Sequence, residues 1–200
     1  LFHSYQFLVL LATVAIAHQF LPARFRWCAL LIASYVFYAA WRVEYLALIV
    51  ASTLIDYAVG RALDRYASHR ARRLLLATSL TLNLGLLFTF KYFNFLADSA
   101  GTLARALGMD YLAPHLEVLL PVGISFYTFQ TLSYTIDRYR NETPAERHLG
   151  RFALFVAFFP QLVAGPIERA SRLLPQLAET KSFDYDRVRS GLLLMLYGFF

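Results

Sequence analysis

Four stretches of this chain, 5–21, 27–41, 74–90 and 119–136, are mainly apolar and contain no Asp, Glu, Lys or Arg side chain. A similar apolar block occupies residues 45–60. Crossing a bilayer takes about 17–25 apolar helical residues, and a single span must be helical because lipid cannot satisfy backbone hydrogen bonds. Hydrophobic residues make up 58% of the chain, against about 45–50% in soluble domains. We therefore expect an all-α, polytopic integral membrane protein, with residues 1–200 forming part of one membrane domain.

The basic residues between these blocks predict an orientation. Residues 61–73 carry Arg61, Arg65, Arg70, Arg72 and Arg73 against Asp64. The positive-inside rule places such a loop in the cytoplasm. Arg24 and Arg26 then also lie inside, whereas Glu44 and the amino terminus lie outside. Crossings by 74–90 and 119–136 return the basic segment 138–151 to the cytoplasm, with 93–107 as an interfacial helix outside.

The positive charge of the chain and its first apolar block can each be interpreted in two ways. The net charge of +6 does not predict a nucleic-acid partner, because the arginines lie between apolar blocks, where cytoplasmic loops face anionic lipid. The partner that they indicate is the lipid bilayer. Block 5–21 is interpreted as an uncleaved first helix, although residues 15–17 resemble a signal-peptidase site and a signal peptide is the alternative. Cys28 has no partner for a disulfide.

The apolar block 152–164 is too short to cross a bilayer straight and contains Pro160, with Gly165 and Pro166 directly after it. Irregular backbone at membrane depth persists only where protein or a water-filled cavity satisfies its polar groups. We therefore predict a re-entrant segment that lines an internal funnel. Because the sequence ends inside the apolar run that begins near Val188, we expect a piece truncated within a helix.

A polar stripe marks the block 119–136. Its hydroxyl side chains recur at steps of three and four residues, which places them on one helical face: Ser125, Thr128, Thr131 and Thr135. Small hydroxyl residues commonly pack membrane helices together. The alternative function of the stripe is to form one wall of a hydrophilic channel, with Tyr127 and Gln130 beside it.

Candidate reacting groups are few. The sequence lacks a G-x-S-x-G nucleophile elbow, a His-Glu-x-x-His zinc motif and a phosphate-binding glycine loop. These absences give no support to hydrolase, metalloprotease or P-loop functions, and no metal site is predicted. The five histidines lie in loops or near helix ends, where surface roles are the expected ones: His3, His18, His69, His115 and His148. Glu168 and Arg169 form an acid–base pair beside a helix-breaking Gly-Pro, which is typical either of an exposed interface or of a functional membrane site.

Two strings carry a family resemblance. The run 120–130 (LPVGISFYTFQ), followed by SY and DRYR, and the run 158–169 (FFPQLVAGPIER), followed by LPQ, resemble the signature of bacterial membrane-bound O-acyltransferases. Within that family the strings look closest to members that acetylate alginate, and the match covers nearly the whole chain. The resemblance implies an inner-membrane O-acetyltransferase whose helices surround a funnel leading to an extracytoplasmic polysaccharide.

The resemblance also implies where along the protein the catalytic residue and the chamber-lining residues lie. The family's catalytic histidine lies in a Trp-His motif, and this chain has no Trp-His pair, so we expect that residue beyond position 200 and no activity from these residues alone. The motif positions are expected to line the chamber: Tyr127, Thr128, Gln130, Gln161, Glu168 and Arg169. No bound cofactor is expected; acetyl-CoA is the implied donor, and polysaccharide-acetylation proteins are the implied partners. A transporter or flippase, or a non-catalytic scaffold of an export complex, is the alternative.

Overall fold

The computed structural model describes residues 5–109, 114–116, 120–162, 165–179 and 183–199. Within these ranges the chain is helical and contains no strand. The elements are α1 (Tyr5–Phe20), α2 (Ala23–Ala39), the 3-10 helix η1 (Val43–Tyr45), α3 (Leu46–Arg65), α4 (His69–Lys91), α5 (Phe93–Ala106), α6 (Ile124–Tyr139), α7 (Leu149–Ala157), α8 (Phe159–Leu162), α9 (Ala170–Ala178) and α10 (Tyr185–Phe199). The predicted all-α fold is confirmed.

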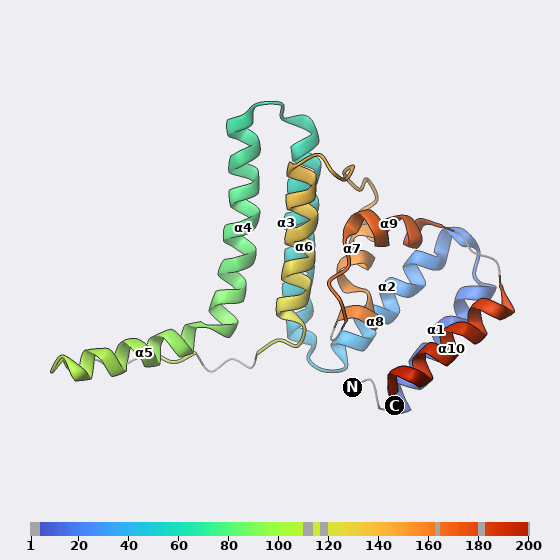
Figure 1. Ribbon diagram of the computed structural model, residues 1–200, viewed down its shortest axis with the longest axis horizontal. Helices are drawn as coiled ribbons and strands as arrows, with labels where there is room; N and C mark the ends of the chain where they lie inside the picture. Colours follow the sequence, from blue (N-terminus) through green and yellow to red (C-terminus); the bar gives the residue numbers. More distant parts are fainter. Residues whose placement is uncertain (1–4, 110–113, 117–119, 163–164, 180–182, 200) are drawn as a thin grey trace.

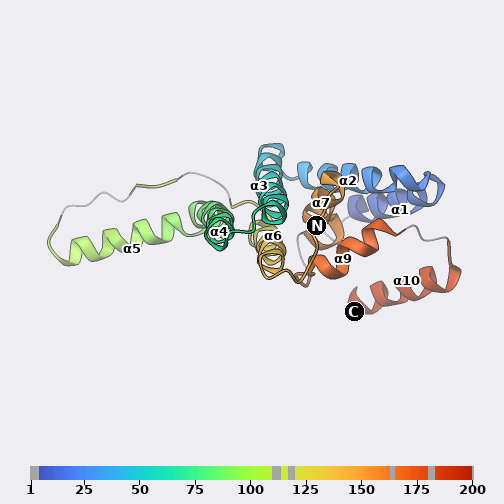
Figure 2. The ribbon, with the colours of Figure 1, turned by 90° about the horizontal axis from the view of Figure 1, so that it is seen from above.

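The helices pack in two neighbouring groups (Figures 1 and 2). In the first group, α6 packs against both α3 and α4. In the second, α7 packs against α2 and α9, and it also contacts α3, which joins the groups. Aromatic side chains fill this junction: the ring centroids of Tyr134 and Phe152 lie 4.6 Å apart, and those of Phe152 and Phe155 lie 5.9 Å apart. The core therefore sits where α3, α6 and α7 meet.

Two helical stretches among the described residues are long and apolar enough to cross a membrane, Val43–Arg65 and His69–Lys91. Shorter apolar helices occupy Tyr5–Phe20 and Leu149–Leu162. Together with the wholly helical fold, these elements identify a helical membrane protein. The sequence underestimated the length of α3 and α4, because most of the predicted basic loop 61–73 is helical and only residues 66–68 connect the two helices.

The two basic segments meet at one end of the first group. Arg72 donates from Nη1 to the Leu63 carbonyl (2.6 Å) and from Nη2 to the Tyr139 carbonyl (2.7 Å). Arg138 forms an ion pair with Asp64 and donates to the Thr143 carbonyl (3.0 Å). Segments 61–73 and 138–151 therefore share one side, as the predicted orientation requires. The sequence analysis assigned Arg138 to the basic segment that follows the apolar block 119–136, whereas it is a largely buried residue of α6.

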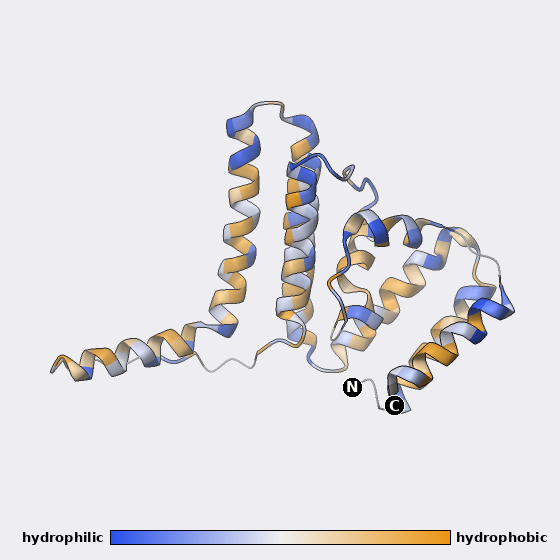
Figure 3. Ribbon diagram, in the orientation of Figure 1, coloured by the Kyte–Doolittle hydropathy of each residue, from blue (hydrophilic) through white to orange (hydrophobic). Residues whose placement is uncertain are grey.

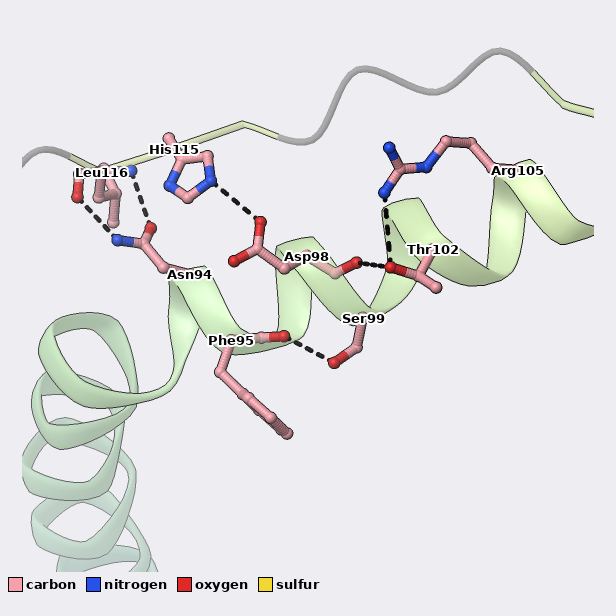
Figure 4. Close-up of polar contacts among 8 residues, drawn as sticks. All are labelled: Asn94, Phe95, Asp98, Ser99, Thr102, Arg105, His115 and Leu116. Carbon is pink, nitrogen blue, oxygen red and sulfur yellow. Dashed lines mark hydrogen bonds and ion pairs between the residues drawn. The ribbon is translucent and has the colours of Figure 1, made fainter.

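Helix α5 leaves the first group and projects away from it (Figure 1). Its polar face holds the returning chain: the Asn94 side chain makes two 2.9 Å hydrogen bonds with the backbone of Leu116, and Asp98 lies 2.9 Å from His115 (Figure 4). On its other face Phe95 and Leu103 are exposed. The expected helix at 93–107 is confirmed, and its location at a membrane interface remains a prediction. The neighbouring positions 110–113 and 117–119 lie outside the described residues.

Large apolar side chains are exposed along several helices, and apolar residues occur along most of the helices (Figure 3). In α10, which the sequence predicted as an apolar run from Val188, Leu192, Leu194 and Tyr197 are exposed. On α4, Leu74 and Phe88 are also exposed. Soluble monomers rarely expose contiguous apolar surface on this scale, whereas lipid or neighbouring membrane helices readily cover it.

Gly150 allows α7 to approach α2 closely. A Cβ atom at Gly150 would lie 2.1 Å from Cζ3 of Trp27. We expect Gly150→Ala to destabilise the full-length protein by about 1–2 kcal/mol, because the indole must shift away from His148, with which it makes a ring contact. Thermal unfolding in detergent measures the loss. Gly85→Ala is the matched control, since its Cβ would meet no described atom within 4 Å; equal effects of the two substitutions would contradict the prediction.

Candidate functional site

A break in the helix formed by α7 and α8 is the central feature of the candidate site. The backbone leaves the helical conformation at Phe158 (φ −55°, ψ 107°). Pro160 follows in α8 and has no N–H to donate to the Val156 carbonyl. In a continuous helix, the N–H of Phe159 would donate to the carbonyl of Phe155. The break separates these two groups.

Side chains from two other helices satisfy the separated groups. Gln130 of α6 donates from Nε2 to the Phe155 carbonyl (2.7 Å). Ser34 of α2 accepts from the Phe159 N–H at Oγ (3.2 Å) and donates to the Leu30 carbonyl (2.7 Å). Ser34, Phe155 and Phe159 are almost inaccessible to solvent. An unpaired backbone group in such surroundings costs several kcal/mol, so Gln130 and Ser34 make the break possible.

The two family strings meet at this break. Gly123 precedes α6 with a left-handed backbone (φ 75°), and a Cβ there would lie 2.5 Å from the Leu162 carbonyl oxygen. Ile124 and Tyr127 share a core cluster with Leu162. The start of α6 and the end of α8 are therefore in direct contact. Of the predicted re-entrant segment 152–164, residues 163 and 164 lie outside the described residues.

The six predicted chamber residues fall into two sets. Tyr127, Thr128 and Gln130 are buried on α6. The hydroxyls of Tyr127 and Thr128 have no hydrogen-bond partner among the described residues, whereas Gln130 is engaged with the break. The other three lie on or after α8: Gln161 donates to the Pro166 carbonyl (2.8 Å), Glu168 is half-buried and Arg169 is exposed. The structure therefore places the α6 set inside and the second set toward the surface.

A buried polar network that the sequence analysis did not identify lies between α3, α4 and α6. Asp56 is fully buried. Its Oδ1 accepts from the hydroxyls of Ser79 and Thr135, the latter at 3.0 Å, and its Oδ2 accepts from Asn83 Nδ2 (2.8 Å). Asn83 Oδ1 accepts in turn from Ser52 (2.6 Å). An acid inside an apolar block, with Ser79 and Asn83 four residues apart in the next block, was the available signal.

One residue of the polar stripe on α6, Thr135, belongs to this network. Thr131 and Thr135 are fully buried, and Thr135 bonds to Asp56 across the helix interface. Thr131 donates to the Thr128 carbonyl (3.1 Å) within its own helix. Ser125, at the start of the stripe, accepts from Lys91 (3.3 Å). Thr135 thus serves helix packing, whereas the hydroxyl of Thr128 has no hydrogen-bond partner among the described residues.

The histidines include one with a clear structural role. His148 caps α7, because its Nδ1 accepts from the Arg151 N–H (3.2 Å), and its ring contacts Trp27 at 4.6 Å. His115 pairs with Asp98 on the surface, and His3 lies outside the described residues. Among the described residues no group of three or more His, Cys, Asp or Glu side chains is arranged to hold a metal ion.

Comparison with known proteins reveals several relatives. A probable alginate O-acetylase AlgI of Azotobacter vinelandii is 39% identical over 99% of this chain, and its counterpart in Pseudomonas aeruginosa is 40% identical over 99%. A peptidoglycan O-acetyltransferase of Helicobacter pylori is 32% identical over 86% of the chain. No family model and no solved structure matches the chain.

The aligned part is a minority of each relative. The chain covers 40% of the Azotobacter protein, 38% of the Pseudomonas protein and 36% of the Helicobacter protein. Within the aligned region the two family strings form the contact around the broken helix. The resemblance to bacterial membrane-bound O-acyltransferases is thus confirmed, and this chain is a relative, over almost its whole length, of proteins named alginate O-acetylase.

Proposed function

We propose that the complete protein containing this chain is an O-acetyltransferase that acetylates hydroxyls of an extracytoplasmic polysaccharide such as alginate. The observation that carries the proposal is the contact between the two family strings at the broken helix, in a chain whose relatives are named O-acetylases. We further propose that it crosses the inner membrane several times, so that a donor from the cytoplasm can reach an acceptor outside.

In the proposed reaction, an acceptor hydroxyl attacks the acetyl carbonyl of a thioester such as acetyl-CoA. The new O–C bond forms as the C–S bond breaks, and a histidine beyond residue 200 takes the hydroxyl proton and passes it to the departing thiolate. This chain would contribute walls that orient donor and acceptor. The buried hydroxyls of Tyr127 and Thr128 are available to donate hydrogen bonds into such a chamber. Proteins of polysaccharide acetylation are the proposed partners.

The second string provides the test of this proposal. In the full-length protein, we expect Gln161→Ala and Glu168→Ala to lower the O-acetyl content of the polymer about 10- to 100-fold, because misplaced reactants lose orientation. The assay is ester content of the polysaccharide from a host that lacks its own O-acetylase. Leu54→Ala is the control, because Leu54 is exposed on α3.

Each outcome of this assay has a defined meaning. Normal acetylation in both variants would remove the chamber assignment of the second string. If the wild-type protein were well expressed in the membrane and left the polymer unacetylated, with its partner proteins present, the enzymatic proposal itself would fail. A transporter or a scaffold would give that second result.

A further inference from the structure

A basic cavity of about 280 Å³ lies outside the candidate site, where the α1–α2 connection meets the start of α7 and the end of α9. Three arginines line it, Arg24, Arg26 and Arg151, together with His18 and His148. Glu179 is the acid in its wall. The arginines come from segments far apart in the sequence, so the fold gathers them at this point.

The charges of this cavity leave a positive excess. Arg151 pairs with Glu146 at 3.5 Å, and its Nε has no hydrogen-bond partner among the described residues. Arg24 is exposed and contacts the Phe25 ring, without an ion pair in the described part of the chain. Setting Glu146 and Glu179 against the three arginines still leaves one positive charge. A concave site with such an excess attracts anions.

An apolar cavity of about 290 Å³ adjoins the basic one. The two share His18, Leu30 and Leu177 in their walls. From His18 the apolar cavity follows α1 back to Leu11, a distance of about 10 Å at 1.5 Å per residue. Polarity therefore changes from cationic to apolar along the axis of α1.

We propose that these joined cavities bind an anionic phospholipid, with its phosphate between Arg24 and Arg151 and an acyl chain beside Leu11 and Val14. Arginine forks match phosphate oxygens, and basic pockets between membrane helices on the cytoplasmic side bind anionic head groups. The apolar cavity, which a soluble phosphate would leave empty, favours a lipid over a free anion. This inference does not depend on the proposed enzymatic activity.

The head-group half is tested with full-length protein in nanodiscs of phosphatidylglycerol or phosphatidylcholine. Native mass spectrometry counts retained phosphatidylglycerol. Arg24→Gln is expected to weaken retention about fivefold, and Arg24→Gln with Arg151→Gln about 30-fold, since each charge near a membrane surface contributes roughly fivefold. Arg70→Gln is the control, because Arg70 is also exposed but lines neither cavity. Unchanged retention in Arg24→Gln would overturn the proposal even if the double variant fails to fold.

The acyl-chain half has its own variant. Ala15→Trp fills the apolar cavity without altering charge, whereas Ala12→Trp adds the same bulk at a position that does not line it. We expect Ala15→Trp alone to reduce phosphatidylglycerol retention. Pyrophosphate is the soluble probe. If pyrophosphate displaced the lipid completely and Ala15→Trp retained it as wild type does, the site would bind a soluble phosphate group and the lipid assignment would be wrong.

Discussion

Asp56→Leu is expected to lower the stability of the full-length protein by about 2–3 kcal/mol, because a buried donor loses its acceptor. Ser79 and Thr135 can redirect their hydroxyls to carbonyls of their own helices. Asn83 cannot do so fully: one of its N–H groups already donates to the Ser79 carbonyl (3.0 Å), and the other loses Asp56 Oδ2. Thermal unfolding in detergent measures the change.

Two further variants identify the cause of this loss. Asp56→Asn keeps an acceptor oxygen for the hydroxyls of Ser79 and Thr135 but turns an amide N–H₂ toward Asn83, so an intermediate loss is expected. Adding Asn83→Leu to Asp56→Leu removes the stranded donor and should recover part of the stability, as expected when a buried polar group and its partner are both replaced by apolar residues. A single Asp56→Leu variant as stable as wild type would show that the network contributes nothing.

Gln130→Leu is expected to destabilise the protein by about 2–3 kcal/mol, because the Phe155 carbonyl would remain buried without a donor. Leucine has nearly the volume of glutamine, so the loss would not come from a cavity. We also expect a large fall in polysaccharide acetylation, since the start of α6 would no longer be tied to the broken helix. Unfolding and polymer ester content are measured on the same preparation.

Ser34→Ala provides the matched comparison on the opposite side of the break. It strands the Phe159 N–H, whereas Gln130→Leu strands the Phe155 carbonyl. The double variant should lose less than the sum of the two single losses, because the freed groups can then bond to each other as in a continuous helix. Strict additivity would show that the two side chains do not act on one shared break.

The sequence predicted the helical class because long apolar blocks leave few other solutions in a membrane. It also predicted the discontinuity near Pro160, because a proline disrupts a helix through its own ring and its missing N–H, whatever the rest of the fold is. It underestimated the lengths of α3 and α4. Charged residues indicate where a segment leaves the lipid, but they do not indicate where a helix ends, because Arg and Ala are good helix formers in water as well. Helical structure therefore continues from the apolar blocks into the basic segments.

The candidate site was harder to predict, because the roles of its residues depend on contacts between helices that are far apart in the sequence. The sequence identified the strings around Gln130 and Gln161, but it did not predict the different roles of the two glutamines. The place of Gln130 in a chamber wall stays a prediction. Its amide also replaces a backbone donor for Phe155, a role that depends on a residue 25 positions away in the sequence. The role of Asp56 could not be predicted from the block 45–60 alone, because its partners are neutral side chains from other helices that come together only in three dimensions.

The hydrogen-bond partners of the broken helix are synthesised before it. Ser34 and Gln130 both precede Phe155 in the chain, so the ribosome delivers both partners before the segment that needs them. The two backbone groups that the break separates are therefore satisfied by side chains that are synthesised earlier, and their hydrogen bonds do not depend on later parts of the protein.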